Sequence, residues 1–285
     1  MSDFREVTIG RLLRETAARY PRREAFVHPD EFLNSCVAVA KGFMALGVKK
    51  GDHVSVWTTN LPEWLYMQFG LSMIGAVFVT VNTNYKSHEL EYIVRQSDST
   101  TFVIMESYRD TNYVATVNEI FPELSASDAG SLSVERLPYL KNIVYIGGRD
   151  VTPGMFRFEE VVRLGYEVSD GELREREESL DARDVINMQY TSGTTGFPKG
   201  VMLTHYNIVN NARMVGDVMG MTEHDRLLIH VPLFHCFGCV MSTLNSVCHG
   251  SAMVVLENFD AEKSLRAVES EQCTAINGVP TMFIA

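Results

Sequence analysis

The stretch YTSGTTGFPKG, residues 190–200, gathers residue types that can bind a phosphate chain. It holds three glycines, four hydroxyl side chains after the tyrosine, one proline and one lysine. Glycine lets backbone N–H groups approach an anion, serine and threonine add hydroxyl donors, and lysine adds a mobile positive charge. Three or four bonds of about 1.5–3 kcal/mol each are enough to hold the phosphates of a nucleotide. The candidate phosphate-binding residues are Thr191, Ser192, Gly193, Thr194, Thr195, Gly196, Lys199 and Gly200.

The same stretch could also be a plain surface loop or a Walker A loop. A run of Gly, Ser and Thr is most often a plain surface loop, but this one follows an apolar strand pattern, carries a lysine beyond its glycines and returns at once to apolar sequence. A Walker A loop requires Gly, four residues and then Gly-Lys-Ser/Thr. Here Gly200 follows Lys199, so the pattern does not fit. The stretch therefore predicts a phosphate loop of another kind.

Elements that could position this loop alternate along the chain. Short runs rich in Val and Ile predict strands, and stretches with apolar residues at helical spacing separate them. The predicted strands are 53–57, 76–81, 101–105, 142–146, 186–190, 226–230, 252–256 and 273–277. The predicted helices are 8–20, 31–46, 62–75, 87–96, 109–120 and 205–219, with two more within 236–247 and 260–271. This alternation is typical of an α/β fold with mostly parallel sheets flanked by helices.

Composition limits the class of protein. The chain has 285 residues and a net charge of −11, which argues against a broad nucleic-acid-binding surface. It has no run of about 18 apolar residues, so we expect no integral membrane segment. The early acidic residues and the absence of an apolar core argue against a signal peptide. The odd number of cysteines, five, suits reduced and buried thiols, and we expect a cytoplasmic protein.

The quoted stretch, extended to YTSGTTGFPKGVMLTH, resembles the signature loop of the adenylate-forming (AMP-binding) superfamily. Three other segments resemble that family in the same order: NLPEWLYMQFGLSMIGAVFVTVN, VPLFHCFG and NGVPTMF. The resemblance covers essentially the whole chain and is closest to the fatty and medium-chain acyl-CoA synthetases. It implies the N-terminal part of the large domain of such an enzyme.

The resemblance also implies ligands and roles. Family enzymes join a carboxylic acid to ATP, release pyrophosphate, and pass the acyl group to a thiol, usually that of coenzyme A. ATP, Mg²⁺, coenzyme A and a small carboxylic acid, most simply a fatty acid, are therefore the expected ligands. Residues 191–196 and Lys199 would hold the β and γ phosphates. His235 would lie beside the acyl carboxylate and the thiol channel, and Gly278, Val279 and Pro280 would begin the wall of the acyl pocket.

The chain departs from the family pattern at its end. By resemblance, the parts that follow Ala285 would carry the metal-binding glutamate, the ribose-binding aspartate and the catalytic lysine, so no catalytic or metal-binding residue is assigned here. We expect residues 1–285 to be a partial AMP-binding domain, roughly 1–184 as a first α/β portion and 185–285 as the phosphate-loop portion, without the C-terminal domain. Such a fragment should be inactive alone and, with an uncovered sheet, poorly soluble.

Several alternatives stay open from the sequence. The enzyme could activate an aryl acid or an amino acid instead of a fatty acid, or the chain could be a non-catalytic nucleotide-binding remnant. A zinc site at Cys236-x2-Cys239, with His235, Cys248 and His249 nearby, is disfavoured because these cysteines interrupt an apolar, helix-like run. The acyl chain length, the thiol acceptor and the oligomeric state are not determined.

Overall fold

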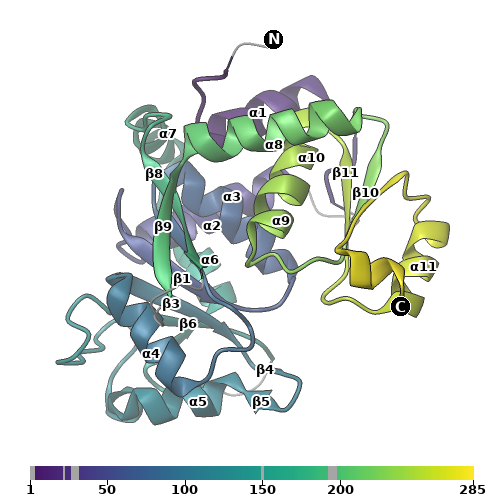
Figure 1. The fold of residues 1–285 in the computed structure, drawn as a ribbon. Helices are drawn as coiled ribbons and strands as arrows, with labels where there is room; N and C mark the ends of the chain where they lie inside the picture. Colours follow the sequence, from purple (N-terminus) through teal and green to yellow (C-terminus); the bar gives the residue numbers. More distant parts are fainter. Residues whose placement is uncertain (1–3, 22, 27–31, 149–150, 192–197) are drawn as a thin grey trace.

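A computed structural model describes residues 4–21, 23–26, 32–148, 151–191 and 198–285. Its main sheet has seven strands in the order β7-β6-β3-β1-β2-β8-β9 (Figure 1). Every neighbouring pair is parallel except β8 and β9, which are antiparallel. The strands are β1 (His53–Trp57), β2 (Val77–Thr80), β3 (Ser99–Met105), β6 (Asn142–Ile146), β7 (Met155–Arg157), β8 (Val185–Thr191) and β9 (Lys199–Thr204).

A second, smaller sheet has the order β11-β10-β12 and is parallel throughout. Its strands are β10 (Arg226–Ile229), β11 (Ala252–Val255) and β12 (Ala275–Asn277). A short antiparallel pair joins β4 (Ser107–Tyr108) to β5 (Thr111–Asn112). The predicted α/β class with mostly parallel sheets is therefore confirmed.

Helices cover both faces of the main sheet, because successive strand residues point to opposite sides. Val54 and Val56 of β1 join a core formed with α1 (Ile9–Arg19), α2 (Phe32–Ala45), α3 (Pro62–Ile74) and α6 (Phe158–Leu164). Trp57, Val77 and Val79 face the other way, into a core formed with α4 (Ser87–Gln96) and α5 (Tyr113–Ile120) (Figure 1). The sheet is thus the middle layer of three.

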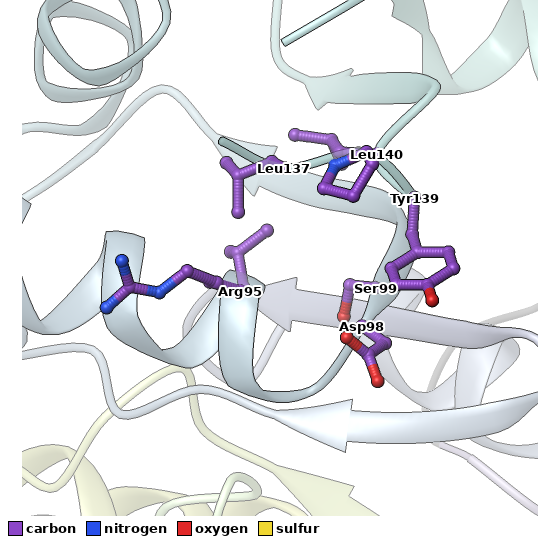
Figure 2. A pocket seen from close by; sticks show the side chains of 8 residues that line it. Arg95, Asp98, Ser99, Leu137, Tyr139 and Leu140 are labelled. Atoms are coloured by element: carbon purple, nitrogen blue, oxygen red, sulfur yellow. The ribbon is translucent and has the colours of Figure 1, made fainter. Parts of the chain in front are cut away.

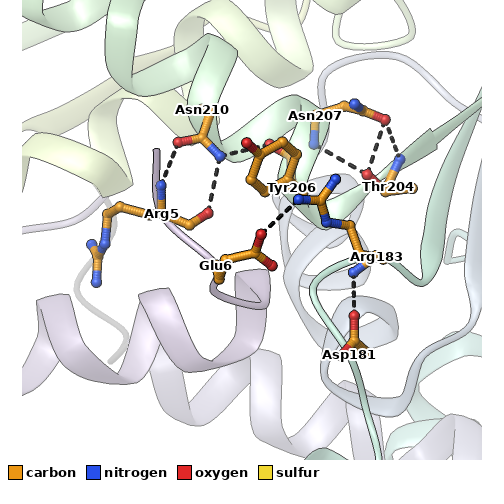
Figure 3. A network of polar contacts seen from close by, with 8 residues as sticks. All are labelled: Arg5, Glu6, Asp181, Arg183, Thr204, Tyr206, Asn207 and Asn210. Atoms are coloured by element: carbon orange, nitrogen blue, oxygen red, sulfur yellow. Dashed lines mark hydrogen bonds and ion pairs between the residues drawn. The ribbon is translucent and has the colours of Figure 1, made fainter. Parts of the chain in front are cut away.

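Helix α8 (His205–Met219) follows β9 directly and is fixed at its start, as Figure 3 shows. The Thr204 hydroxyl accepts from the Asn207 backbone N–H at 3.1 Å. One turn further, the Asn210 side chain pairs with the backbone of Arg5, accepting from its N–H at 2.8 Å and donating to its carbonyl at 3.0 Å. The N-terminal segment therefore holds α8, and with it the end of β9, in place.

The structure adds elements that the sequence patterns did not predict. Strand β9 forms in the apolar segment directly after the loop, and neither β9 nor β7 is among the predicted strands. The predicted helix 109–120 begins only at Tyr113, because the β4–β5 pair occupies the residues before it. Helix α11 (Ala261–Ser270) matches the helix predicted within 260–271, and α7 (Asp170–Glu178) is a mostly charged helix between α6 and β8.

The predicted helix within 236–247 consists of three parts. These are α9 (Cys236–Gly238), a π-helical segment (Cys239–Leu244) and α10 (Asn245–His249). The Cys239 carbonyl accepts from the side chains of Gln68 and Thr243, both at 2.7 Å. Side chains that insert into the backbone ladder in this way are a recognised cause of irregular helix geometry.

The other sequence expectations have mixed outcomes. No helix of the described residues has the length and apolar character needed to cross a membrane. All five cysteines are unpaired. Cys36 and Cys239 are buried as expected, but Cys236, Cys248 and Cys273 are only partly buried.

Candidate functional site

The carboxyl ends of strands from both sheets meet around Asn60, a buried residue shortly after β1. Its Nδ2 donates to the carbonyls of Val231 and Leu256, each at 3.0 Å. Its Oδ1 accepts from the Leu233 N–H at 2.9 Å. These bonds join the segments that follow β1, β10 and β11. Ligands of α/β proteins bind outside the carboxyl ends of the strands, so this junction marks the edge where a site is expected.

The stems of the predicted phosphate loop lie on two neighbouring strands. Strand β8 ends at Thr191 and β9 begins at Lys199, and these two residues are cross-strand partners. Both are exposed. Ser192, Gly193, Thr194, Thr195 and Gly196 lie outside the described residues. The structure therefore positions the two ends of the loop, with a hydroxyl on one strand and a cation on the other.

Helix α4 holds both stems of the loop. The Tyr92 hydroxyl donates to the Pro198 carbonyl at 3.2 Å, and the Tyr190 hydroxyl donates to Gln96 Oε1. Burial raises the pKa of Tyr190, which keeps this hydroxyl neutral. A Cβ at Gly200 would lie 3.0 Å from Met188 Sδ, so a larger residue would crowd the hairpin. The ends of the loop are thus fixed by packing as well as by strand pairing.

His235 precedes α9 and is exposed. Its carbonyl accepts from the N–H groups of Gly238 and Cys239, at 2.9 and 3.0 Å. Its ring packs 5.0 Å from that of Phe234, a half-buried residue, while the neighbouring Phe237 packs against the main core. A Cβ at Gly238 would lie 2.4 Å from the Pro232 carbonyl oxygen. Only glycine permits the tight turn that leaves the His235 side chain accessible.

The third predicted group follows β12. Gly278 is half-buried, and Val279 and Pro280 are exposed. Just before them, Asn277 Nδ2 donates to Ser242 Oγ of the π-helical segment at 2.9 Å. The end of β12 therefore contacts the same helical run that begins beside His235.

One buried histidine at this edge was missed by sequence reasoning. His230, directly after β10, is only 2% exposed, and its Nδ1 lies 2.8 Å from Ser264 Oγ. Its Nε2 is buried and has no hydrogen-bond partner among the described residues. Burial lowers the pKa of His230, and a Cβ on Gly278 would lie 3.4 Å from Nε2. The available signal was a polar residue at the end of the apolar run RLLIH.

Hydrogen bonds link these separate groups. Gln189, two residues before Thr191, donates from Nε2 to Cys239 Sγ at 3.2 Å. The backbone N–H of Cys239 donates a hydrogen bond to the His235 carbonyl. The phosphate-loop stem, the His235 turn and the end of β12 therefore all contact one helical run, residues 236–249.

A small pocket lies elsewhere, near the amino end of β3 (Figure 2). It lies where β3 begins and before the start of β6, and none of the predicted site residues lines it. Its lining residues are Val94, Arg95, Asp98, Ser99, Leu137, Pro138, Tyr139 and Leu140. Because it faces the amino ends of the parallel strands, this pocket is not the predicted site.

Within the described ranges, no group of three or more His, Cys, Asp or Glu side chains is arranged to hold a metal ion. Cys236 and Cys239 lie within these ranges, whereas His28, Asp30 and Glu31 lie outside them.

The chain folds as an α/β domain in which segments after β1, β10 and β11 meet at the carboxyl ends of the strands. The family described as "AMP-binding enzyme" matches residues 13–285. The chain therefore belongs to the AMP-binding enzyme family.

Its curated relatives are acyl-CoA synthetases and ligases. The Bacillus subtilis (strain 168) protein YngI, which bears the provisional name of acyl-CoA synthetase, is 50% identical over 100% of this chain and 53% of its own length. The mitochondrial medium-chain acyl-CoA ligase ACSF2 of Rattus norvegicus is 35% identical over 97% of this chain and 47% of its own. The chain thus spans about half the length of these relatives.

Solved structures share the fold at low sequence identity. Apo MbtA from Mycobacterium smegmatis has a TM-score of 0.81 at 23% identity, covering 98% of this chain and 49% of that one. The anthranilate CoA ligase AuaEII, solved with anthranoyl-AMP, has a TM-score of 0.79 at 23% identity, covering 98% of this chain and 51% of that one. At these identities the likeness concerns the fold alone.

Proposed function

We propose that residues 190–200 bind the polyphosphate of ATP in an AMP-forming acyl-CoA ligase. The observation that carries this proposal is the pairing of Thr191 with Lys199 across β8 and β9, with both strand ends held by α4. This pairing places a residue with a hydroxyl and a residue with an ammonium group opposite each other at the two ends of the loop. A fixed frame lowers the entropy cost of gathering donors around a triphosphate.

In the proposed reaction, a carboxylate oxygen attacks the α-phosphorus of ATP and pyrophosphate leaves. Negative charge grows on the pyrophosphate as the bond breaks. The Lys199 ammonium group and the loop hydroxyls and N–H groups stabilise that charge, since preorganised donors act most strongly where charge develops. Mg²⁺ would accompany ATP and neutralise part of its charge, and no residue is assigned as its ligand.

The second proposed step transfers the acyl group from AMP to the thiol of coenzyme A. His235, with its exposed ring at the start of α9, and Gly278, Val279 and Pro280 after β12 are proposed to line the path of acid and thiol. The names of the relatives favour an aliphatic acid, because ACSF2 is named a medium-chain acyl-CoA ligase. The alternative acids are an aryl acid or an amino acid. The alternative acceptor is the thiol of a carrier protein.

Replacing Lys199 with alanine tests the phosphate role. We expect a non-hydrolysable ATP analogue to bind the K199A variant about tenfold more weakly, because one charge-assisted contact contributes about 1.5 kcal/mol. Isothermal titration calorimetry in the presence of Mg²⁺ measures this change. Lys263→Ala is the matched control, because it removes the same charge from an exposed position on α11.

Equal binding by K199A and the unaltered chain would contradict the phosphate role of Lys199. Absence of binding by both the K199A variant and the unaltered chain would instead favour an inert, non-catalytic remnant. Since both strand ends are exposed, the variant is expected to remain folded, and its melting temperature checks this.

We further propose that residues 1–285 do not complete the adenylation step by themselves, because they span about half the length of the relatives. A coupled pyrophosphate-release assay with fatty, aryl and amino acids should show no turnover above a protein-free control. Turnover with any acid would refute this proposal, and the preferred acid would identify the substrate class.

A further inference from the structure

The Cys-Phe-Gly-Cys run at residues 236–239 is not used by the proposed function. Cys236 is the first residue of α9 and Cys239 the first of the π-helical segment. Side chains three positions apart on a helix are neighbours, with Cβ atoms about 5–6 Å apart. A disulfide needs these atoms at about 3.5–4.5 Å, so the two side chains must approach each other for the bond to form.

The two thiols differ in their surroundings. Cys236 is partly buried, whereas Cys239 is 1% exposed and accepts a hydrogen bond from Gln189 at 3.2 Å. Interaction with the Cys239 thiol lowers the pKa of Cys236 to about 7, and the same interaction together with burial raises the pKa of Cys239. A partly exposed thiol with a lowered pKa beside a buried second thiol is the arrangement of a reactive cysteine and its resolving partner.

The other cysteines lack this arrangement. Burial raises the pKa of Cys36, Cys248 and Cys273, which keeps each in its less reactive thiol form. The described residues also offer no cluster of three or more metal-ligating side chains at Cys236 and Cys239. Exchange with a disulfide is a reaction that such a pair of thiols can carry out.

We propose that Cys236 is a redox modification site that reacts with low-molecular-weight disulfides, and that Cys239 resolves the adduct to an intramolecular disulfide. The Cys236 thiolate attacks one sulfur of the small disulfide, forming a mixed disulfide and releasing one small thiolate. The Cys239 thiol then loses its proton to solvent and attacks Cys236 Sγ, releasing the second small thiolate. The protein gives up two electrons and the small disulfide is reduced to two thiols.

Closing this bond would convert the sulfur that accepts from Gln189 Nε2 from a thiol into a disulfide sulfur. Gln189 lies on β8, two residues before the loop stem at Thr191. The redox state of the pair would therefore alter a contact of the strand that leads into the phosphate loop. The thiol chemistry itself does not depend on the function proposed above.

Incubating the reduced chain with oxidised glutathione tests the proposal. Intact mass should fall by two hydrogen atoms, and peptide mapping should place the new disulfide between Cys236 and Cys239. Dithiothreitol should reverse it. Cys239→Ser should stop the reaction at one glutathione adduct on Cys236, whereas Cys236→Ser should leave residue 239 unmodified. Cys273→Ser, a change at a partly buried cysteine outside the pair, should react as the unaltered chain does.

Three results would overturn the proposal. They are a Cys236 that stays reduced while another cysteine reacts, a chain that takes up no oxidant at all, and a mixed disulfide at Cys236 that persists with Cys239 intact. Mapping of the unaltered chain requires no substitution, so misfolding of a variant would not prevent the decision.

Discussion

Asn60→Ala is expected to lower the free energy of unfolding by at least about 3 kcal/mol. The substitution removes three side-chain hydrogen bonds and leaves the Leu233 N–H and the carbonyls of Val231 and Leu256 without this partner. Each buried polar group left unpaired costs about 1–3 kcal/mol. Urea unfolding followed by circular dichroism measures the loss from the shift in midpoint.

Asn84→Ala is the matched control, because Asn84 is exposed and its side chain bonds only locally, to Asn82. Its midpoint should be nearly unchanged. Asn60→Asp keeps an acceptor for Leu233 but loses both N–H donors, so it should also be destabilised. If the midpoint of Asn60→Ala matched that of Asn84→Ala, the junction between the two sheets would not depend on Asn60.

Acidification from pH 6.5 to pH 4 is expected to destabilise the chain by on the order of 3 kcal/mol through His205 alone. This histidine is fully buried, and its Nδ1 accepts from the Ile9 N–H at 3.1 Å. Burial lowers its pKa from 6.5 to about 4, although Asp184 and Asp181 nearby favour the charged form and Lys50 opposes it.

The direction follows from proton binding. Between pH 6.5 and about 4 the unfolded chain binds a proton at this residue and the folded chain does not, so stability falls as the pH falls through that window. Below about pH 4 both states are protonated and this loss stops growing.

His205→Asn isolates the effect, because asparagine can keep an acceptor for Ile9 but does not ionise. The difference in unfolding free energy between pH 7.5 and pH 4.5 should be smaller in this variant by most of that amount. His88→Asn, at an exposed position, should retain the full pH dependence of the unaltered chain. If His205→Asn kept the same pH dependence, His205 would not be its source.

The amino-acid sequence by itself determined the class of fold. Local patterns predicted the bounds of several elements correctly. The predicted ranges 53–57, 87–96, 142–146 and 205–219 match β1, α4, β6 and α8. Thr8 and Gly75 mark helix ends as their types suggest, the first as a side-chain cap and the second with φ of 73°. The sequence also supplied the candidate loop and the family resemblance.

Only the tertiary structure decided which of these residues are neighbours. Strand β9 is a half-exposed edge strand whose existence depends on pairing with β8, a contact that local periodicity does not encode. Asn60 and His230 form side-chain hydrogen bonds with residues more than thirty positions away in the chain, Leu233 and Ser264 respectively. Burial and long-range hydrogen bonds depend on how the two sheets pack, so the carboxyl-edge junction and the Cys236–Cys239 environment could be found only in three dimensions.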